Sequence, residues 1–250
     1  MAVNRHNGKR TRNVYVPGAP EPFKLSRSKL ELYVECPRCF YLDRRLGVGR
    51  PEGFPFTLNS AVDTLLKKEF DIHRARGEAH PLMAHYNVDA IPFSHPRLDK
   101  WRENFVGVQY LYEPANFLIT GAVDDIWVTP QGKLHVVDYK ATSTTREITL
   151  DEEYRQGYKR QMEIYQWLLR QNGFSVSDTG YFVYVNGRTD LEAFDGRLEF
   201  TIKLITYVGN DDWVEILIQK AHKCLNADYI PEPSENCAYC VYVNAVCKEL

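Results

Sequence analysis

The cysteines of this 250-residue chain gather near its two ends, and no other feature constrains the fold as much. They stand at Cys36, Cys39, Cys224, Cys237, Cys240 and Cys247. Because 200 residues separate Cys36 from Cys237, any site that both share must bring an early segment of the chain against a late one. The two Cys-x-x-Cys pairs, Cys36/Cys39 and Cys237/Cys240, supply four thiolates, which suit tetrahedral zinc or equally an iron–sulfur cluster.

The composition is that of a globular protein, with 44% hydrophobic and 26% charged residues. No apolar run approaches the length of a membrane span, and residues 1–13 lack the apolar stretch of a secretory signal. We therefore expect a cytoplasmic protein that does not bind membranes. Six cysteines in such a protein favour metal or core use over a disulfide framework.

The net charge of −2 hides an uneven distribution. Residues 1–50 hold 11 Lys/Arg and 4 Asp/Glu, a balance of +7, whereas the rest hold 20 and 29, a balance of −9. The basic segment fits either a surface that faces phosphate groups or a solvated arm without a partner. We expect residues 1–22 to form a disordered basic arm and residues 23–250 a single domain. Within it, segments 23–50 and 226–250 would form a satellite around the cysteine metal site.

Hydrophobic periodicity predicts helices and strands in alternation. The expected helices cover 25–47 (broken at Pro37), 57–76, 154–171 and 211–226, the last opened by an Asn/Asp cap. The expected strands cover 106–112, 117–128, 133–141, 181–185 and 197–207, and 78–104 shows no clear pattern. This order predicts a mixed α/β fold.

Two aspartates, Asp124 and Asp138, flank a predicted hairpin with the turn Pro130-Gln131-Gly132. If these three residues form the loop, with the glycine left-handed, Thr129 pairs with Lys133 and the aspartates lie opposite each other. Directly opposed residues point to the same face, with Cβ atoms about 5 Å apart. A two-residue loop would instead send the carboxylates to opposite faces.

Carboxylates this close repel unless a cation lies between them, and oxygen ligands suit Mg²⁺ or Mn²⁺. Lys140 emerges on the same face as Asp138, where its ammonium can orient a water or stabilise charge on a phosphate. The same spacing also fits an exposed hairpin face with an Asp–Lys ion pair. Gln161 favours the site, because it interrupts the apolar stripe of the 154–171 helix and needs partners there.

Together these segments resemble the PD-(D/E)XK nuclease superfamily, in particular its RecB-like and CRISPR-associated exonuclease branch. The matching stretches are Cys36-Pro37-Arg38, Gly121-Ala122-Val123-Asp124, Val137-Asp138-Tyr139-Lys140, Gln161-x-x-x-Tyr165 and the cysteines from Cys237. The resemblance implies a restriction-endonuclease-like core, a central mixed β-sheet flanked by helices. It also implies a catalytic metal on Asp124 and Asp138, a nucleophile positioned by Lys140, and support of the site or contact with the DNA backbone by Gln161 and Tyr165.

The branch usually carries a metal-binding histidine on the helix before the sheet, and here the matching position is Asp63. The resemblance therefore implies Asp63 as a further metal ligand, since a carboxylate can replace an imidazole on Mg²⁺. Considered alone, Asp63 fits an acid at the edge of an amphipathic helix.

The iron–sulfur form of the branch uses one early and three late cysteines. These would be Cys36, Cys237, Cys240 and Cys247, around a [4Fe–4S] cluster. Cys39 and Cys247 thus compete for the fourth position, with zinc as the alternative to the cluster.

The sequence predicts a divalent-metal-dependent DNA nuclease, an exonuclease or end-processing enzyme that acts on single-stranded DNA or free ends in repair, recombination or CRISPR adaptation. The alternative is a non-catalytic DNA-end-binding protein of the same fold. It is supported by Asp63, which stands where the branch usually has a metal-binding histidine. A thiol-redox or structural zinc module is a third. Redox Cys-x-x-Cys motifs follow a strand, whereas the residues before Cys36 are predicted to be helical.

Overall fold

The computed structural model describes residues 5–6, 8–51, 53–54 and 56–249. The chain divides into two compact units, each built from separate segments. We call residues 1–54, 109–120 and 212–250 the terminal unit, and residues 55–108 and 121–211 the central unit. None of the described helices combines the length and apolarity needed to cross a membrane.

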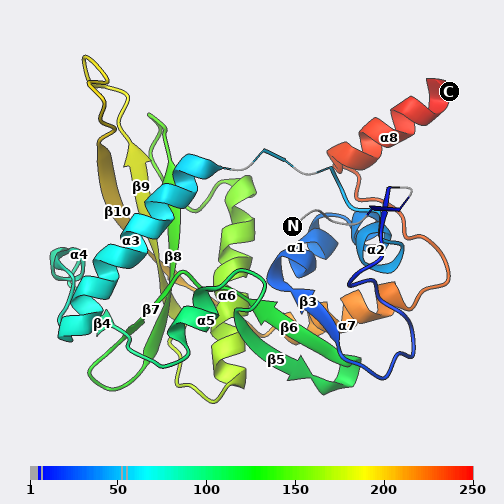
Figure 1. Cartoon of the computed structure of the whole chain (residues 1–250), viewed down its shortest axis with the longest axis horizontal. Coiled ribbons are helices and arrows are strands. Elements are labelled where there is room, and N and C mark those ends of the chain that lie inside the picture. The colour runs from blue at the N-terminus through cyan, green and yellow to red at the C-terminus, as the bar shows by residue number, and fades with distance from the viewer. Residues whose placement is uncertain (1–4, 7, 52, 55, 250) are drawn as a thin grey trace. The chain divides into compact units, whose positions relative to one another are not determined.

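A five-stranded mixed sheet forms the middle of the central unit (Figure 1). Its strand order is β10-β9-β8-β7-β4, in which β8 and β9 are parallel and the other neighbours antiparallel. The strands are β4 (Ile91–Pro92), β7 (Asp125–Val128), β8 (Leu134–Thr142), β9 (Thr179–Gly187) and β10 (Phe200–Val208). The first six residues of β8 are all buried, as an inner strand covered on both faces requires.

Two long helices, α3 (Thr57–Arg76) and α6 (Gln156–Gln171), contact β8. Phe70 of α3 stacks on Trp127 of β7, with ring centroids 5.5 Å apart. On α6, the sulfur of Met162 lies where a side chain at Gly180 would begin. A Cβ at position 180 would also lie 3.0 Å from the Val136 carbonyl oxygen, so the glycine lets α6 pack closely on the sheet. The helices fix the β8 residues that point toward them.

The stretch 78–104, which has no clear sequence pattern, contains α4 (Pro81–His85), β4 and α5 (Leu98–Arg102). From α5, Arg102 donates to the fully buried Asp125 at 2.7 Å, and Arg74 of α3 contacts the same carboxylate. The hydroxyl of Tyr139 donates to it at 2.8 Å. These contacts neutralise a buried charge and fix α5 and α3 against the start of β7.

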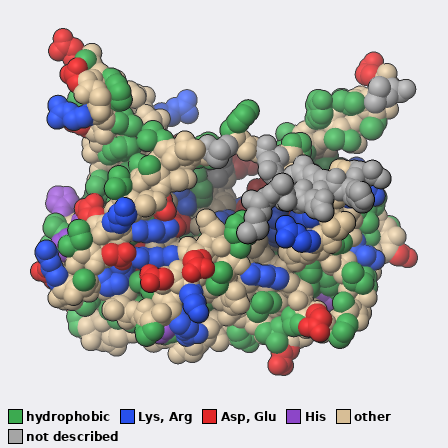
Figure 2. All heavy atoms as spheres, in the orientation of Figure 1, with side chains coloured by type: hydrophobic (Ala, Val, Ile, Leu, Met, Phe, Trp, Pro, Cys, Tyr) green, Lys and Arg blue, Asp and Glu red, His purple; other side chains and the backbone are tan. Residues whose placement is uncertain are grey.

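The terminal unit combines four helices with a three-stranded sheet of order β3-β6-β5. Its helices are α1 (Arg27–Glu35), α2 (Pro37–Arg45), α7 (Val214–Leu225) and α8 (Ala238–Glu249). Its strands are β3 (Phe23–Ser26), β5 (Val108–Tyr112) and β6 (Phe117–Gly121), with the short pair β1 (Arg5–His6) and β2 (Lys9–Arg10). Hydrophobic side chains gather along α8 (Figure 2), where Tyr242 and Val243 are exposed.

The predicted fold class and most helices are confirmed. The 25–47 segment breaks at Pro37 into α1 and α2, because proline cannot continue α1 but fits the first position of α2. Helix α3 covers 57–76 as predicted and ends at the left-handed Gly77. Two short 3₁₀ turns, Glu113–Ala115 and Glu153–Arg155, complete the described elements.

One predicted strand, 117–128, is wrong as a single element. It divides into β6 and β7, which belong to different sheets. At the break the Val123 amide donates to the Trp101 carbonyl at 3.1 Å, and Arg102 donates to the Asp124 carbonyl at 3.0 Å. These backbone groups bond to α5 rather than to a neighbouring strand, so the strand pattern ends there.

The predicted start of the last long helix at Asp211, with an Asn/Asp cap, is also wrong. Helix α7 begins at Val214, and its N-cap residue Trp213 makes no side-chain capping bond. The Asp211 carboxylate instead accepts a hydrogen bond from Arg170 at 2.5 Å. The Asp211 carboxylate, which the sequence predicted to cap the last helix, is therefore bound to Arg170 of α6 instead.

Candidate active site and metal centre

The β7–β8 hairpin forms in the predicted register. The Thr129 amide donates to the Lys133 carbonyl at 3.0 Å, and Gly132 is left-handed with φ 79°. The strands pair back from this turn to Asp125, which lies opposite Val137. One residue further on, the Asp124 carboxylate accepts the backbone N–H of Tyr139, which puts it next to Asp138 of β8. The local turn chemistry thus brings the two aspartates together as expected.

Asp124 is fixed through both its backbone and its side chain. One carboxylate oxygen, Oδ2, accepts the backbone N–H of Tyr139 at 2.9 Å. The other, Oδ1, lies 3.4 Å from the Nζ of Lys67. Because Arg102 also holds the carbonyl, the carboxylate has little freedom to turn away from β8.

Asp138 is fully buried, with a hydrogen bond to one carboxylate oxygen and an ion pair at the other. The amide nitrogen of Gln161 donates to its Oδ1 at 2.7 Å, and Lys140 forms an ion pair with its Oδ2. Gln161 also lies 3.1 Å from the Tyr165 hydroxyl. The buried amide of α6 therefore has the partners that its place in an apolar stripe requires.

The ammonium of Lys140 is nearly buried and lies 4.6 Å from the ring centroid of Tyr158. Burial alone lowers the pKa of Lys140, but the charges of Asp138 and Asp124 raise it above its ordinary value. The side chain is therefore a cation at neutral pH, held between a carboxylate and an aromatic face.

Asp63 is connected to Asp124 by Lys67, a residue that was not predicted to belong to the site. The Nζ of Lys67 lies 2.8 Å from Asp63 Oδ2 and bridges to Asp124. Burial and the nearby charge of Asp124 raise the pKa of Asp63. The available signal was the four-residue spacing of Asp63 and Lys67, which places both side chains on one face of α3.

The glycine of the Gly-Ala-Val-Asp stretch, Gly121, leaves room for the ring of Tyr165. A Cβ at this position would lie 2.6 Å from a ring carbon of Tyr165. The ring of Tyr165 therefore rests on the bare backbone, from which its hydroxyl reaches Gln161. The chain of contacts runs from Gly121 through Tyr165 and Gln161 to Asp138.

The chemistry of the donor set suits a divalent cation, but among the described residues only the four thiols of the terminal unit lie close enough together to share one ion. The carboxylates of Asp63, Asp124 and Asp138 carry three negative charges, and Lys67 and Lys140 return two positive ones. Carboxylate oxygens are the ligands that Mg²⁺ and Mn²⁺ prefer. The Lys67 ammonium lies between the carboxylates of Asp63 and Asp124. It therefore neutralises part of their negative charge, as a metal ion bound between them would.

A second group of ligands lies in the terminal unit, where the sulfurs of Cys36, Cys39, Cys237 and Cys240 all lie within 4.8 Å of one another. Cys39 is 3.6 Å from Cys237 and 3.7 Å from Cys240, and Cys36 is 3.8 Å from Cys240. All four are buried. Sulfurs around one tetrahedral zinc at about 2.3 Å are separated by about 3.8 Å. The donor set thus fits a single ion.

Both Cys-x-x-Cys pairs lie at helix N-termini. Cys36 is the N-cap of α2, where its sulfur accepts the Cys39 amide at 3.5 Å, and Cys237 directly precedes α8. Burial raises the pKa of Cys237, but the Cys240 amide and neighbouring thiols bring it to about 7. Burial raises the pKa of Cys39 and Cys240, so of these three thiols Cys237 is the one shifted toward the thiolate, the form that binds metal.

The remaining two cysteines lie outside this group. Cys247 is exposed, on the same helix as Cys240 but two turns further along. Cys224 is half-buried on α7, and burial raises its pKa to about 11. Of the two candidates for a fourth ligand, the structure gathers Cys39 with the other three thiols.

A mixed sheet with an Asp/Asp-x-Lys group beside its central strand is the architecture of a metal-dependent nuclease core. The sequence profile of the PD-(D/E)XK nuclease superfamily matches residues 24–248. The chain therefore belongs to the PD-(D/E)XK nuclease superfamily, which indicates metal-dependent nuclease activity and a nucleic acid substrate.

No curated protein matches the sequence. Among solved structures, the one described as "Crystal structure of SSO0001" shares 18% identity with a TM-score of 0.41, covering 93% of this chain and 89% of that chain. A likeness at this level adds nothing to the family assignment.

Proposed function

We propose that the protein is a Mg²⁺- or Mn²⁺-dependent deoxyribonuclease of the RecB-like branch that acts on single-stranded or free-ended DNA. One observation carries the proposal: the carboxylates of Asp124 and Asp138 both act on the Lys140 ammonium, which forms an ion pair with Asp138 on the same strand. Substrates of this kind arise in repair, recombination and CRISPR adaptation.

In this proposal Asp124 and Asp138 hold the catalytic cation, which lowers the pKa of a bound water and stabilises charge on the phosphate. Lys140 orients the attacking water or the phosphate with its fixed ammonium. Gln161 and Tyr165 position Asp138, since one amide nitrogen contacts both the carboxylate and the phenol. Asp63 contributes its charge from α3.

For the thiol group we propose one tetrahedral zinc. Three of the six sulfur–sulfur distances are 3.6–3.8 Å, and all six are within 4.8 Å, which supports a single ion. A [4Fe–4S] cluster places a separate iron behind each sulfur, and it therefore needs the sulfurs further apart than one ion does. Elemental analysis and the visible spectrum of anaerobically purified protein distinguish the two: one zinc and no colour supports the proposal, and a band near 400 nm with four irons overturns it.

The activity is tested with end-labelled single- and double-stranded DNA in Mg²⁺ or Mn²⁺. We expect cleavage by the parent protein, and a loss of about a thousandfold or more in Asp138→Asn and Lys140→Met, because each removes several kcal/mol of transition-state stabilisation. Asp190→Asn serves as the control, since its carboxylate pairs with Arg188 and lies away from the site. The Asp190→Asn control should cleave at the rate of the parent protein. If Asp138→Asn and Lys140→Met cleave DNA as fast as this control, the cleavage comes from a contaminating nuclease.

A non-catalytic DNA-end-binding protein is the second candidate. The observation that favours it is the bridge of Lys67 between Asp63 and Asp124, which places a protein cation where a metal would bind. DNA binding by the parent protein without cleavage in either Mg²⁺ or Mn²⁺ would support this candidate and exclude the nuclease.

A further inference from the structure

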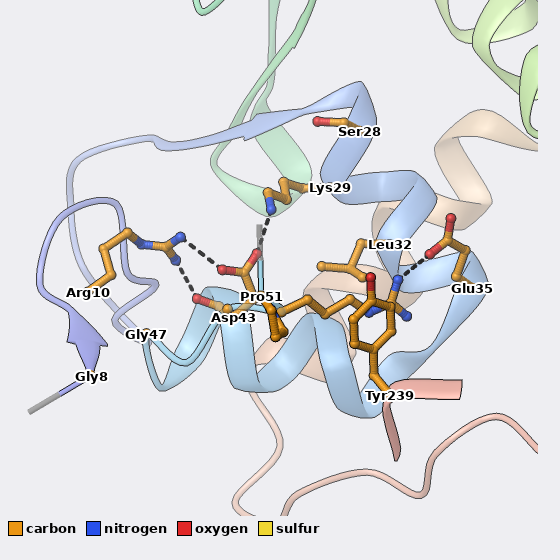
Figure 3. A pocket seen from close by; sticks show the side chains of 12 residues that line it. Gly8, Arg10, Ser28, Lys29, Leu32, Glu35, Asp43, Gly47, Pro51 and Tyr239 are labelled. Atoms are coloured by element: carbon orange, nitrogen blue, oxygen red, sulfur yellow. Dashed lines mark hydrogen bonds and ion pairs between the residues drawn. The ribbon is translucent and has the colours of Figure 1, made fainter. Parts of the chain in front are cut away.

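A hollow of about 400 Å³ opens in the terminal unit (Figure 3). Ser28 and Lys29 of α1, Asp43 of α2 and Tyr239 of α8 line it, together with Arg10 and Arg50. Its volume lies within the range of small-ligand sites. No residue of the Asp124–Asp138 group belongs to it, so it is separate from the candidate active site.

The hollow carries surplus positive charge. Asp43 is buried, and three cations share it: Arg10 at 2.8 Å, Lys29 at 2.7 Å and Arg44 at 2.9 Å. Among the described residues it is the one carboxylate in ion-pair contact with these three. Arg44 is buried and does not line the hollow, and Arg50 and Glu35 pair with each other, so the lining keeps a surplus of one positive charge.

The low pKa of Asp43 is consistent with the excess of cations around its carboxylate. Burial alone raises it, but hydrogen bonds and charge from Arg44 and Lys29 bring it to about 2. Lys29 and Arg10 nevertheless keep part of their surface exposed, at 33% and 20% of the side chain. Both therefore retain donors that an anion entering the hollow can reach.

An aromatic ring forms another wall. The Arg50 guanidinium lies 4.6 Å from the ring centroid of Tyr239 and forms an ion pair with Glu35 at 2.5 Å. Figure 3 shows Tyr239 and Glu35 on one side of the hollow, with Arg10, Lys29 and Asp43 on the other. Tyr239 remains 44% exposed. The hollow thus offers cations on one side and, on the other, a ring that has Arg50 over one face and keeps part of its surface open.

We propose that this hollow binds one nucleotide of a single DNA strand, with the phosphate against Lys29 and Arg10 and the base stacked on Tyr239. The proposal rests on the proposed function, because it names a contact of the same substrate away from the cleavage site. Phosphate contacts by Lys and Arg with stacking on an aromatic ring are the usual means of holding single strands without reading their sequence.

The test measures binding of a fluorescent oligothymidine by anisotropy, over a range of salt concentrations. The cleavage-blocked Asp138→Asn protein is the parent, so that binding is read independently of nuclease activity. If that protein binds but the wild type never cleaves DNA, the proposed nuclease fails while the nucleotide site stands.

In this background Lys29→Gln removes one cation, while Arg10 and Arg44 still pair Asp43. We expect about three- to tenfold weaker binding and a salt slope shallower by about 0.7, the value for one phosphate contact on a single strand. Tyr239→Leu removes the stacking surface and is expected to weaken binding about fivefold or more. The matched control is Lys220→Gln, an exposed lysine of the same unit outside the hollow, which leaves binding unchanged.

Ser28→Asp tests the hollow with a substitution that removes none of the ion pairs of Asp43. It adds a negative charge at the rim of the hollow, in the first turn of α1, where a carboxylate favours the helix. We expect binding to weaken at least as much as in Lys29→Gln. Circular dichroism confirms that each variant is folded.

Two outcomes overturn the proposal. Binding by Lys29→Gln and Ser28→Asp equal to that of Lys220→Gln excludes the hollow as a DNA contact. A loss in Lys29→Gln without any loss in Tyr239→Leu assigns the hollow to a phosphate group alone. In that case millimolar inorganic phosphate competes with the oligonucleotide as well as thymidine monophosphate does.

Discussion

The central and terminal units each gather a set of metal-ligating side chains, but they balance the charge of those ligands in opposite ways. The carboxylates of Asp124 and Asp138 have protein cations beside them, Lys67 and Lys140. Beside the four thiols, the cation in hydrogen-bond contact among the described residues is Arg50, whose Nη2 lies 3.6 Å from Cys237. A site with its own counter-charges keeps its shape without an ion, whereas four thiolates depend on the ion that they bind.

Removing the thiol ligands is expected to have the largest effect. Cys36→Ser or Cys237→Ser should release the metal and unfold the terminal unit, since zinc–thiolate sites contribute on the order of 10 kcal/mol to folding. Hydrogen exchange read by mass spectrometry should show lost protection in 27–45 and 214–249, while α6 and β8 stay protected. Chelation of the metal should act in the same way.

Cys247→Ser is the matched control, because this thiol is exposed and lies outside the four-sulfur group. It should retain the full metal content and the full protection. Metal loss in Cys247→Ser, with retention in Cys39→Ser, would mean that the fourth ligand is Cys247 and that the sulfur grouping is wrong.

In the central unit, removing the support of a ligand should weaken the site without unfolding it. Gln161→Leu deprives Asp138 of one hydrogen bond, and loss of such a supporting contact typically costs ten- to a hundredfold in metal affinity or activity. Tyr165→Phe, which keeps the ring on Gly121, should cost less. Calorimetric titration with Mn²⁺ and cleavage rates measure both effects, and melting temperatures near the parent value show that the fold is kept.

The smallest expected effect has the opposite sign. Lys67→Met removes a cation that competes with a metal for Asp63 and Asp124, so Mn²⁺ should bind about tenfold more tightly. Lys68→Met changes the neighbouring exposed lysine and should leave the affinity unchanged. Weaker Mn²⁺ binding in Lys67→Met would show that Lys67 orients the carboxylates rather than competing for them.

Features that depend on local chain chemistry were predictable from the sequence. The Pro130–Gly132 turn sets the register of the hairpin, and this register leads to Asp124 beside the β8 backbone next to Asp138. Pro37 likewise predicts the break between α1 and α2, and hydrophobic periodicity predicts the bounds of α3. In each case neighbours in the sequence carry the information.

Features that depend on distant partners were not predictable. Lys67 is 57 residues from Asp124, and nothing near Lys67 in the sequence indicates that contact. The break between β6 and β7 depends on bonds to Trp101 and Arg102. The choice of Cys39 over Cys247 depends on α8, which carries Cys247 about 10 Å along its axis from Cys240, since seven residues rise 1.5 Å each.

The segmented build of the terminal unit has a consequence for the order in which a ribosome produces the protein. Every residue of the central unit, through Asp211, is synthesised before Cys237 and Cys240. The early pair, Cys36 and Cys39, must therefore wait through most of translation before its partner thiols exist. A nascent chain stalled near residue 211 already holds all the carboxylates of the candidate active site but only half of the thiol site.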